Sequence, residues 1–327
     1  MAHTPEARGS IVQSDVLNSP ERLTPGIRVV INGQGEGAAL LFDKVSESGH
    51  EVVGVITTVK KTKDGSHDPL RQKAIDSKIP IVNIGDINVN NKLLSEEKYN
   101  AANQKLKDMN AHISVGFYLQ ATMSDETLSI PEFGSINTHY SYLPENAGRD
   151  SMNRDVLEGK DIGISVYMMN QIIDGGDIID QTTFPNPGDQ SQGALYYQHL
   201  EGFVNFVAKS VDKMAIGIDE YRKNGTPLPL VPQDFSKRTY FDPLTPEDLQ
   251  VDFKSMDADR INRTMNAGGP GSTVLIDGVL EKIAKPTVYP GPSFIPGREI
   301  TAIDTSVTMF ETTQGIIGIG RRQKTTS

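Results

Sequence analysis

The chain has 327 residues, of which 37% are hydrophobic and 23% are charged, as is typical of a globular protein long enough for two domains. Its formal net charge of −10 argues against a nucleic acid as the main partner, because binding to phosphates needs a concentrated basic surface. Cysteine is absent, which excludes a disulfide framework, a thiolate nucleophile and cysteine-ligated metal sites. This composition favours a protein of the reducing cytoplasm.

The first stretch of the chain is polar. Residues 1–26 lack the apolar core of a signal peptide, and we expect them to form a polar N-terminal extension. No apolar run in the sequence reaches about 18 residues, the length that a membrane-spanning helix needs. The sequence therefore predicts a protein that does not associate with a membrane.

From residue 27 the chain alternates apolar segments with amphipathic ones. Within residues 27–57 an apolar strand leads through a glycine-rich turn into a helix and then into a second apolar strand. The next expected elements are a helix at 68–78, a strand at 79–84, a helix at 95–109 and a strand at 111–117. This alternation predicts a parallel sheet with crossover helices.

The first turn has the spacing G-x-G-x-x-A over Gly33, Gly35 and Ala38. Between a strand and a helix, this spacing is the fingerprint of a dinucleotide site, in which main-chain N–H groups hold the pyrophosphate. The second half of the fingerprint is missing, because the next strand ends without an acidic residue and continues into Lys60 and Lys61. The sequence favours a tight turn that needs small residues and leaves an NAD or NADP site as the weaker alternative.

The stretch FGSINTHYSYLP, residues 133–144, places an amide and an imidazole together at the end of an apolar segment. Asn137 and His139 are two residues apart, so they point to the same side if the strand extends through them. A hydrogen-bond donor and a base on one side suit acyl transfer. The alternative interpretation is that both are turn and capping residues.

A third polar side chain, Asp174, lies in the turn QIIDGGDII after another apolar strand at 163–170. An acidic residue in a glycine turn is often only a turn former. In a doubly wound sheet, however, ligands bind at the carboxyl ends of the strands, where we expect Asn137, His139 and Asp174 to meet.

The remaining elements divide the chain into two domains. A helix within 151–158 and a long helix from about 192 to 223 complete a first, catalytic domain expected at 27–230. The following segment NGTPLPLVPQD has the proline and polar residues of a linker. Short strands separated by Gly and Pro then predict a small β-barrel domain at 238–321.

The order and spacing of Asn137, His139, Leu143-Pro144 and the Asp174 turn resemble the formyltetrahydrofolate-dependent formyltransferase family. The similarity extends over about residues 27–321, and parts of it resemble methionyl-tRNA formyltransferase and the hydrolase domain of 10-formyltetrahydrofolate dehydrogenase. The resemblance implies an α/β fold with a doubly wound, mostly parallel, Rossmann-like sheet and a small C-terminal β-barrel domain. It also implies an enzyme that uses 10-formyltetrahydrofolate as formyl donor and no metal.

The same resemblance assigns roles to individual residues. Asn137 would donate a hydrogen bond to the oxyanion of the tetrahedral intermediate, His139 would act as general base, and Asp174 would orient His139. The pterin ring of the folate would lie against the main chain of two segments, which contain Phe117, Tyr118, Leu119 and Gln120, and Ile172 and Ile173.

The departures from the family pattern bear on the acceptor. Tyr140 and Ala147 stand where relatives usually have Pro and Arg, at positions that shape the acceptor side. Loss of an Arg removes a clamp for phosphate or carboxylate, so we expect a small-molecule amine as acceptor. Because Asn137 is kept, a transferase is favoured over a formyltetrahydrofolate hydrolase. A methionyl-tRNA formyltransferase and a non-catalytic folate-binding protein are two further candidates, and the chain would act as a monomer or homodimer.

Overall fold

A computed structural model describes residues 24–90, 94–119, 121–252 and 254–268, together with the backbone of the strands between 273 and 320. Most of the N-terminal extension expected at 1–26 lies outside the described residues.

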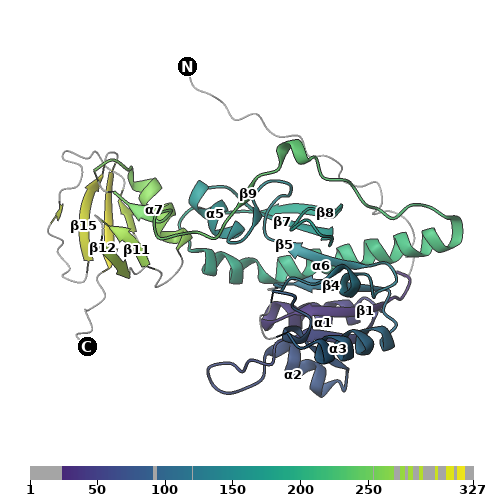
Figure 1. Ribbon diagram of the computed structural model, residues 1–327. Coiled ribbons are helices and arrows are strands. Elements are labelled where there is room, and N and C mark those ends of the chain that lie inside the picture. The colour runs from purple at the N-terminus through teal and green to yellow at the C-terminus, as the bar shows by residue number, and fades with distance from the viewer. Residues whose placement is uncertain are drawn as a thin grey trace.

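A seven-stranded sheet with the order β3-β2-β1-β4-β5-β7-β8 forms the centre of the fold (Figure 1). Its strands are β1 (Arg28–Gly33), β2 (Glu51–Thr57), β3 (Ile81–Asn83), β4 (Ile113–Phe117), β5 (Ser135–His139), β7 (Ile162–Met168) and β8 (Ile178–Phe184). Within this sheet β7 runs antiparallel to both of its neighbours, and the other strands share one direction. The predicted α/β class with a mostly parallel sheet is confirmed.

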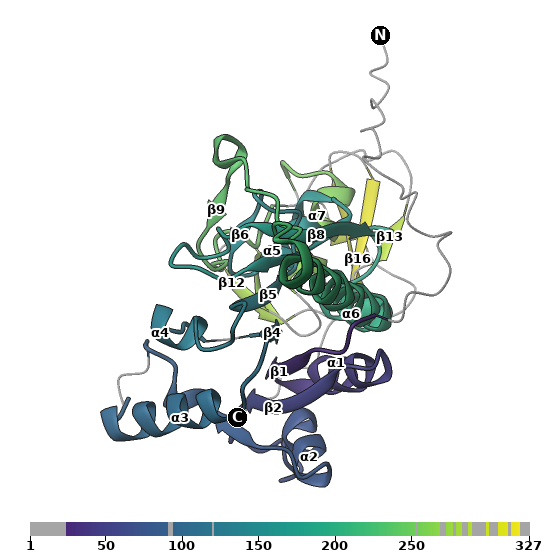
Figure 2. The same ribbon diagram turned by 90° about the vertical axis from the view of Figure 1, so that its right-hand side faces the viewer.

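Helices cover both faces of the sheet, and Figure 2 shows α1 and α6 on the opposite side of β1 and β4 from α3. The described helices are α1 (Gly35–Glu47), α2 (Pro69–Asp76), α3 (Glu96–Asp108), α4 (Asp125–Leu128), α5 (Ser151–Glu158), α6 (Gln192–Asn224) and α7 (Ala258–Ala267), with 3-10 turns η1 (Ile84–Asp86) and η2 (Phe235–Lys237). Ser95 and Ser191 cap α3 and α6 by accepting from main-chain N–H groups, which explains why both helices begin where the sequence predicted. Across the described ranges, no helix is long and apolar enough to cross a membrane.

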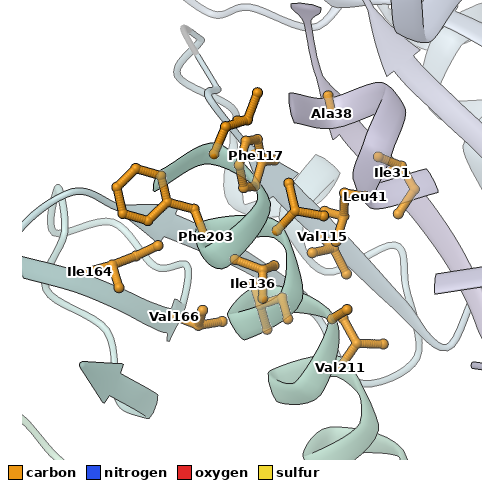
Figure 3. Close-up of a cluster of buried hydrophobic side chains, with 14 of the residues drawn as sticks. Ile31, Ala38, Leu41, Val115, Phe117, Ile136, Ile164, Val166, Phe203 and Val211 are labelled. Carbon is orange, nitrogen blue, oxygen red and sulfur yellow. The ribbon is translucent and has the colours of Figure 1, made fainter. Parts of the chain in front are cut away.

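The main core lies between the sheet and the helices α1 and α6. Ile31, Val115 and Ile136 come from three neighbouring parallel strands, are fully buried and point to this face (Figure 3). Phe203 and Val211 of α6 pack into the same cluster. Side chains alternate along a strand, so the residues that follow these three apolar positions must point to the other face.

A row of residues in register crosses that other face of the sheet. Asn32 pairs with Gly116, Gly116 pairs with Asn137, and Asn137 pairs with Tyr167. Each of the four directly follows an apolar core residue of its own strand, so all four lie on the same face of the sheet. This row positions the candidate site.

Helix α7, which precedes the last strands, packs against the first domain. Asn153 Nδ2 of α5 donates to the main-chain oxygen of Ala267 of α7 at 2.7 Å. Arg260 Nη1 of α7 donates to the main-chain oxygen of Leu157 at 3.0 Å. Ile261 is buried in the same apolar cluster as α1 and α6, so α7 packs as part of that core.

The last strands form two small sheets, and Figure 1 shows them beyond α7, away from the central sheet. β10 (Gln250–Val251), β11 (Thr273–Ile276) and β12 (Val279–Lys282) form one; β13 (Thr287–Tyr289), β16 (Gly315–Gly320), β15 (Val307–Thr312) and β14 (Glu299–Ile300) form the other in that order. Closure of these sheets into the expected barrel depends on residues outside the described ranges and stays a prediction.

Candidate active site

The amide and imidazole expected to face one cavity do lie on one face of β5. The strand continues through both, since Asn137 pairs with Tyr167 and His139 pairs with Ser165. Both side chains are buried, with 9% of each residue exposed. Strand pairing with β7 therefore explains why these polar residues are extended rather than part of a turn.

Asp174 reaches the same place by a different route from the one that the sequence predicted. We expected it at the carboxyl ends of the parallel strands, but β7 is antiparallel to β5, and its last residue, Met168, pairs with Ile136 early in β5. The turn after β7 must therefore fold back over the sheet face. Asp174 has a left-handed φ of 51°, and its Oδ2 lies 3.6 Å from Nδ1 of His139.

The other ring nitrogen of His139 has a main-chain partner. Nε2 lies 3.0 Å from the main-chain oxygen of Asn146. A carbonyl oxygen can only accept, so Nε2 carries a hydrogen and Nδ1 holds the lone pair of the neutral ring. The free base atom of the imidazole is therefore the one that faces Asp174.

Tyr167 joins two of the predicted site residues, although the sequence did not single it out. Its hydroxyl accepts from Asn137 Nδ2 at 3.1 Å and donates to Asp174 Oδ1 at 2.7 Å. Burial, and secondly the negative charge of Asp174, raise the pKa of Tyr167 well above its usual value. Only the antiparallel pairing of β5 with β7 places Tyr167 opposite Asn137, and a single sequence carries no signal for that pairing.

The segment predicted to be a linker, together with the residues just after it, contacts the two loops that contain Asp174 and Asn146. Gln233 Nε2 donates to the main-chain oxygens of Asp174 at 2.9 Å and Gly176 at 2.7 Å. Arg238 Nη2 donates to the main-chain oxygen of Ile173 at 2.6 Å. β9 (Tyr240–Phe241) pairs with β6 (Ala147–Gly148) just after Asn146. This segment is therefore a structural part of the site.

Gly148 completes the contacts of the Asp174 carboxylate. Its main-chain N–H donates to Asp174 Oδ2 at 2.8 Å. Each carboxylate oxygen thus accepts from one donor, the phenol of Tyr167 or the amide of Gly148. These two hydrogen bonds fix the Asp174 carboxylate beside His139.

Asn146 is itself anchored by a buried acid. Its Nδ2 donates to the main-chain oxygen of Ser151 at 2.8 Å and to Asp155 Oδ1 at 3.0 Å. Burial raises the pKa of Asp155 to about 7, against hydrogen bonds from Gly163 and Asn146 that lower it. Asp155 therefore changes charge near neutral pH, behind the loop that holds His139.

The first segment expected to contact folate leaves the end of β4. Phe117 is fully buried, and its ring packs edge-on against that of Tyr140 with centroids 6.2 Å apart. Tyr118 is 44% exposed with a left-handed φ of 57°, and Leu119 is half-buried. Gln120 lies outside the described residues. The side chain of Phe117 belongs to the core, so only its main chain is left for a ligand.

The second expected segment is apolar and open to solvent. Ile172 is 49% exposed and Ile173 is 54% exposed, although both immediately precede buried Asp174. Such exposed aliphatic side chains beside a buried polar cluster suit the edge of a ligand site.

Of the two positions expected to shape the acceptor side, Tyr140 points away from the polar face and Ala147 is buried. The ring of Tyr140 packs against Phe203 at 5.3 Å and against Phe117, on the α6 side of the sheet. Ala147 is fully buried in a small cluster with Leu143 and Tyr167. The ring of Tyr140 therefore does not face the acceptor side expected for this position, because Tyr140 follows His139 directly and points to the opposite face.

The glycine-rich turn at the start of α1 is already occupied by a carboxylate. Asp68 Oδ2 accepts from the main-chain N–H of Gly35 at 2.7 Å, and Oδ1 accepts from that of Leu70 at 3.0 Å. Asp68 is buried, so this charge sits where a dinucleotide would place its pyrophosphate. The interpretation as a tight turn is therefore the better one.

Fold and site together define an α/β protein with a buried amide, imidazole and carboxylate on one face of its sheet. In the ranges that the structure describes, no group of three His, Asp or Glu side chains is placed to hold a metal ion. The model of the formyl transferase family matches residues 26–202. The chain belongs to the formyl transferase family, as its resemblance implied, and is an enzyme of that class.

Individual relatives agree with this assignment. Methionyl-tRNA formyltransferase of Sulfurihydrogenibium sp. (strain YO3AOP1) is 27% identical over 232 residues, 69% of each chain. WlaRD, a sugar 3N-formyl transferase solved in the presence of dTDP and 5-N-formyl-THF, has a TM-score of 0.61 and 18% identity over 91% of this chain and 98% of WlaRD. HypX from Aquifex aeolicus, solved with tetrahydrofolic acid, has a TM-score of 0.59 and 15% identity over 91% of this chain but only 45% of HypX. At these identities the two structures support the fold alone.

Proposed function

We propose that the protein transfers the formyl group of 10-formyltetrahydrofolate to the amine of a small-molecule acceptor. The observation that carries this proposal is the convergence of Asn137, His139 and Asp174 on one sheet face, with His139 Nδ1 and Asp174 Oδ2 3.6 Å apart. A folate donor is supported by the relatives that were solved with tetrahydrofolic acid or 5-N-formyl-THF.

His139 is the general base of the proposed reaction. The acceptor amine attacks the formyl carbon and loses a proton to Nδ1, the ring nitrogen that holds the lone pair. The ring then carries a hydrogen on each nitrogen: Nε2 donates to the main-chain oxygen of Asn146, and Nδ1 faces the Asp174 carboxylate. The carboxylate stabilises the positive charge that forms on His139.

Asn137 stabilises the negative charge that forms on the formyl oxygen. One hydrogen of its Nδ2 is bonded to Tyr167, and the other is left for the oxyanion of the tetrahedral intermediate. Collapse of the intermediate breaks the bond between the formyl carbon and N10 of the folate. The protonated His139 returns its proton to N10, and the base is restored.

The folate is proposed to lie between the two expected segments. Its pterin ring would contact the main chain of Phe117, Tyr118, Leu119 and Gln120, and of Ile172 and Ile173. The exposed aliphatic side chains of Ile172 and Ile173 suit the flat, partly apolar ring. We further propose a catalytic domain at 27–230, a C-terminal β-barrel at 238–321 and a cytoplasmic location.

We propose that the acceptor binds without placing a phosphate at the start of α1, because the Asp68 carboxylate already fills that position. A small amine is further supported by the net charge of −10, which disfavours tRNA. Methionyl-tRNA formyltransferase is the second candidate, because the curated relative that matches 69% of the chain has that activity.

A thermal-shift screen tests this function and searches for the acceptor. The stable analogue 5-formyltetrahydrofolate should raise the melting temperature, and the right amine should raise it further. Amines that pass are then tested for formylation in competition with initiator methionyl-tRNA. Efficient formylation of the tRNA that falls steeply as salt rises would replace the small-molecule acceptor with the second candidate.

A further inference from the structure

The feature that the family pattern does not explain is the phenol between Asn137 and Asp174. Tyr167 is only 3% exposed, and its ring packs in a small apolar cluster with Leu143 and Ile178. Its hydroxyl makes two hydrogen bonds, at 3.1 Å to Asn137 Nδ2 and at 2.7 Å to Asp174 Oδ1. The phenol thus links two residues of the candidate site to each other.

The hydrogens available determine the direction of both bonds. An ionised carboxylate can only accept, and a phenol has a single hydrogen, so Tyr167 donates to Asp174. The phenol oxygen must then accept from the amide, which turns the nitrogen of Asn137 toward Tyr167. Burial raises the pKa of Tyr167 well above its usual value, so the hydroxyl retains its hydrogen at neutral pH.

The oxygen of the Asn137 amide shows that the hydrogen bond to Tyr167 determines how the amide is oriented. Asn137 Oδ1 is buried and has no hydrogen-bond partner among the described residues. It lies over Gly116, where an added Cβ would be 2.3 Å from it. A buried acceptor without a partner is unfavourable, so Oδ1 does not select this orientation. The hydrogen bond to Tyr167 does.

We propose that Tyr167 is a positioning residue for formyl transfer, which fixes Asn137 as a donor and holds Asp174 toward His139. This inference rests on the proposed function, because the donor hydrogen of Asn137 is useful only where an oxyanion develops. Without the phenol, the amide can rotate and present its oxygen, which would repel the oxyanion. Asp174 Oδ1 would also lose its donor.

Tyr167→Phe tests the proposal, because it removes the hydroxyl and keeps the ring in its packing. We expect kcat to fall about tenfold or more, with KM for the formyl donor changed less than about threefold, since the hydrogen bonds act on the transition state. Tyr140→Phe is the matched control: it removes a tyrosine hydroxyl one residue from His139 but on the α6 side of the sheet. That control should change kcat by less than about twofold.

A double variant separates positioning from packing. In an Asn137→Ala background, Tyr167→Phe should lower kcat by a smaller factor than in the wild type, because the part of the effect that acts through Asn137 is already lost. Equal losses in both backgrounds, or equal losses for Tyr167→Phe and Tyr140→Phe, would overturn the proposal.

Hydrogen exchange of the Asn137 side-chain amide provides a readout that needs no turnover. The resonance is assigned by its loss in Asn137→Asp. One amide hydrogen should exchange slowly in the wild type and about tenfold faster or more in Tyr167→Phe. Unchanged exchange would overturn the positioning role. If exchange changes as expected but the wild type formylates no amine, the proposed function fails and the positioning of Asn137 stands.

Discussion

The main-chain oxygen of Asn146 lies 3.0 Å from Nε2 of His139, and this one contact determines which atom of the ring is the base. Asn146 is held in turn from several directions: its main-chain N–H donates to Thr239 Oγ1 at 2.7 Å, and its Nδ2 donates to Ser151 and Asp155. The imidazole is therefore oriented by a loop that two other parts of the chain, α5 and the segment at Thr239, fix in place.

Removing any of the three convergent side chains should lower turnover without unfolding the protein. Asn137→Ala, His139→Ala and Asp174→Ala are each expected to reduce kcat on the order of 100-fold or more, since each acts on charge in the transition state. Steady-state kinetics with circular dichroism checks this. His199→Ala is a suitable control, because it removes an imidazole that binds the main-chain oxygen of Pro185 away from the site. Near-normal turnover of Asp174→Ala would refute the mechanism.

Gly116 should be required for the position of Asn137. An added Cβ would lie 2.3 Å from Asn137 Oδ1, so Gly116→Ala must displace that amide. We expect kcat to fall about tenfold or more. The control is Gly54→Ala in β2, whose Cβ would meet the flexible side chain of Met109 at 2.3 Å and should cost stability but little kcat. Equal kcat in the two variants would show that Asn137 does not need its observed position.

Asp155 should make the protein less stable as pH rises toward neutrality. The folded state holds the proton of Asp155 up to a pKa of about 7, whereas the ordinary pKa of an aspartate is 3.8. The folded state thus binds more protons between these values, and the free energy of unfolding must fall as pH rises through them. The loss from about pH 5 to about pH 8 should be on the order of 2 kcal/mol.

Urea denaturation of the wild type and Asp155→Asn at both pH values measures this loss. The variant has no group to titrate at this position, so its free energy of unfolding should depend less on pH by that amount. The same dependence in both proteins would mean that Asp155 is ionised throughout.

NAD and NADP should not bind with useful affinity. The Asp68 carboxylate occupies the N-terminus of α1 and would repel a pyrophosphate there. Calorimetry should detect no binding of either nucleotide at micromolar concentrations. Micromolar affinity would show that Asp68 moves aside and would reopen the dinucleotide interpretation of Gly33, Gly35 and Ala38.

The sequence predicted the elements whose signal is local. The shared side of Asn137 and His139 follows from strand alternation, and α6 begins after its cap at Ser191, as expected. What failed depends on contacts between distant segments. The antiparallel direction of β7, which brings Tyr167 to Asn137, has no local pattern in the sequence. The tight turn at the start of α1 was predicted, but the contact of Asp68 with that turn was not.

The segment with Gln233 and Arg238 shows the same limit. Its prolines and polar residues are typical of a linker, yet its hydrogen bonds support the main chain around Asp174. Composition identified its lack of regular structure, but composition carries no information on what the segment contacts.

Transfer of a ¹³C-labelled formyl group is the most direct test of the proposed reaction. The wild type and His139→Ala are mixed with 10-[¹³C]formyltetrahydrofolate and an amine from the screen, and the product is followed by NMR. We predict a ¹³C-formamide from the wild type. We expect His139→Ala to form it at a rate that is lower by a factor on the order of 100 or more. Formate as the sole labelled product, or formamide formed equally fast by both proteins, would contradict a formyl transfer in which His139 is the base.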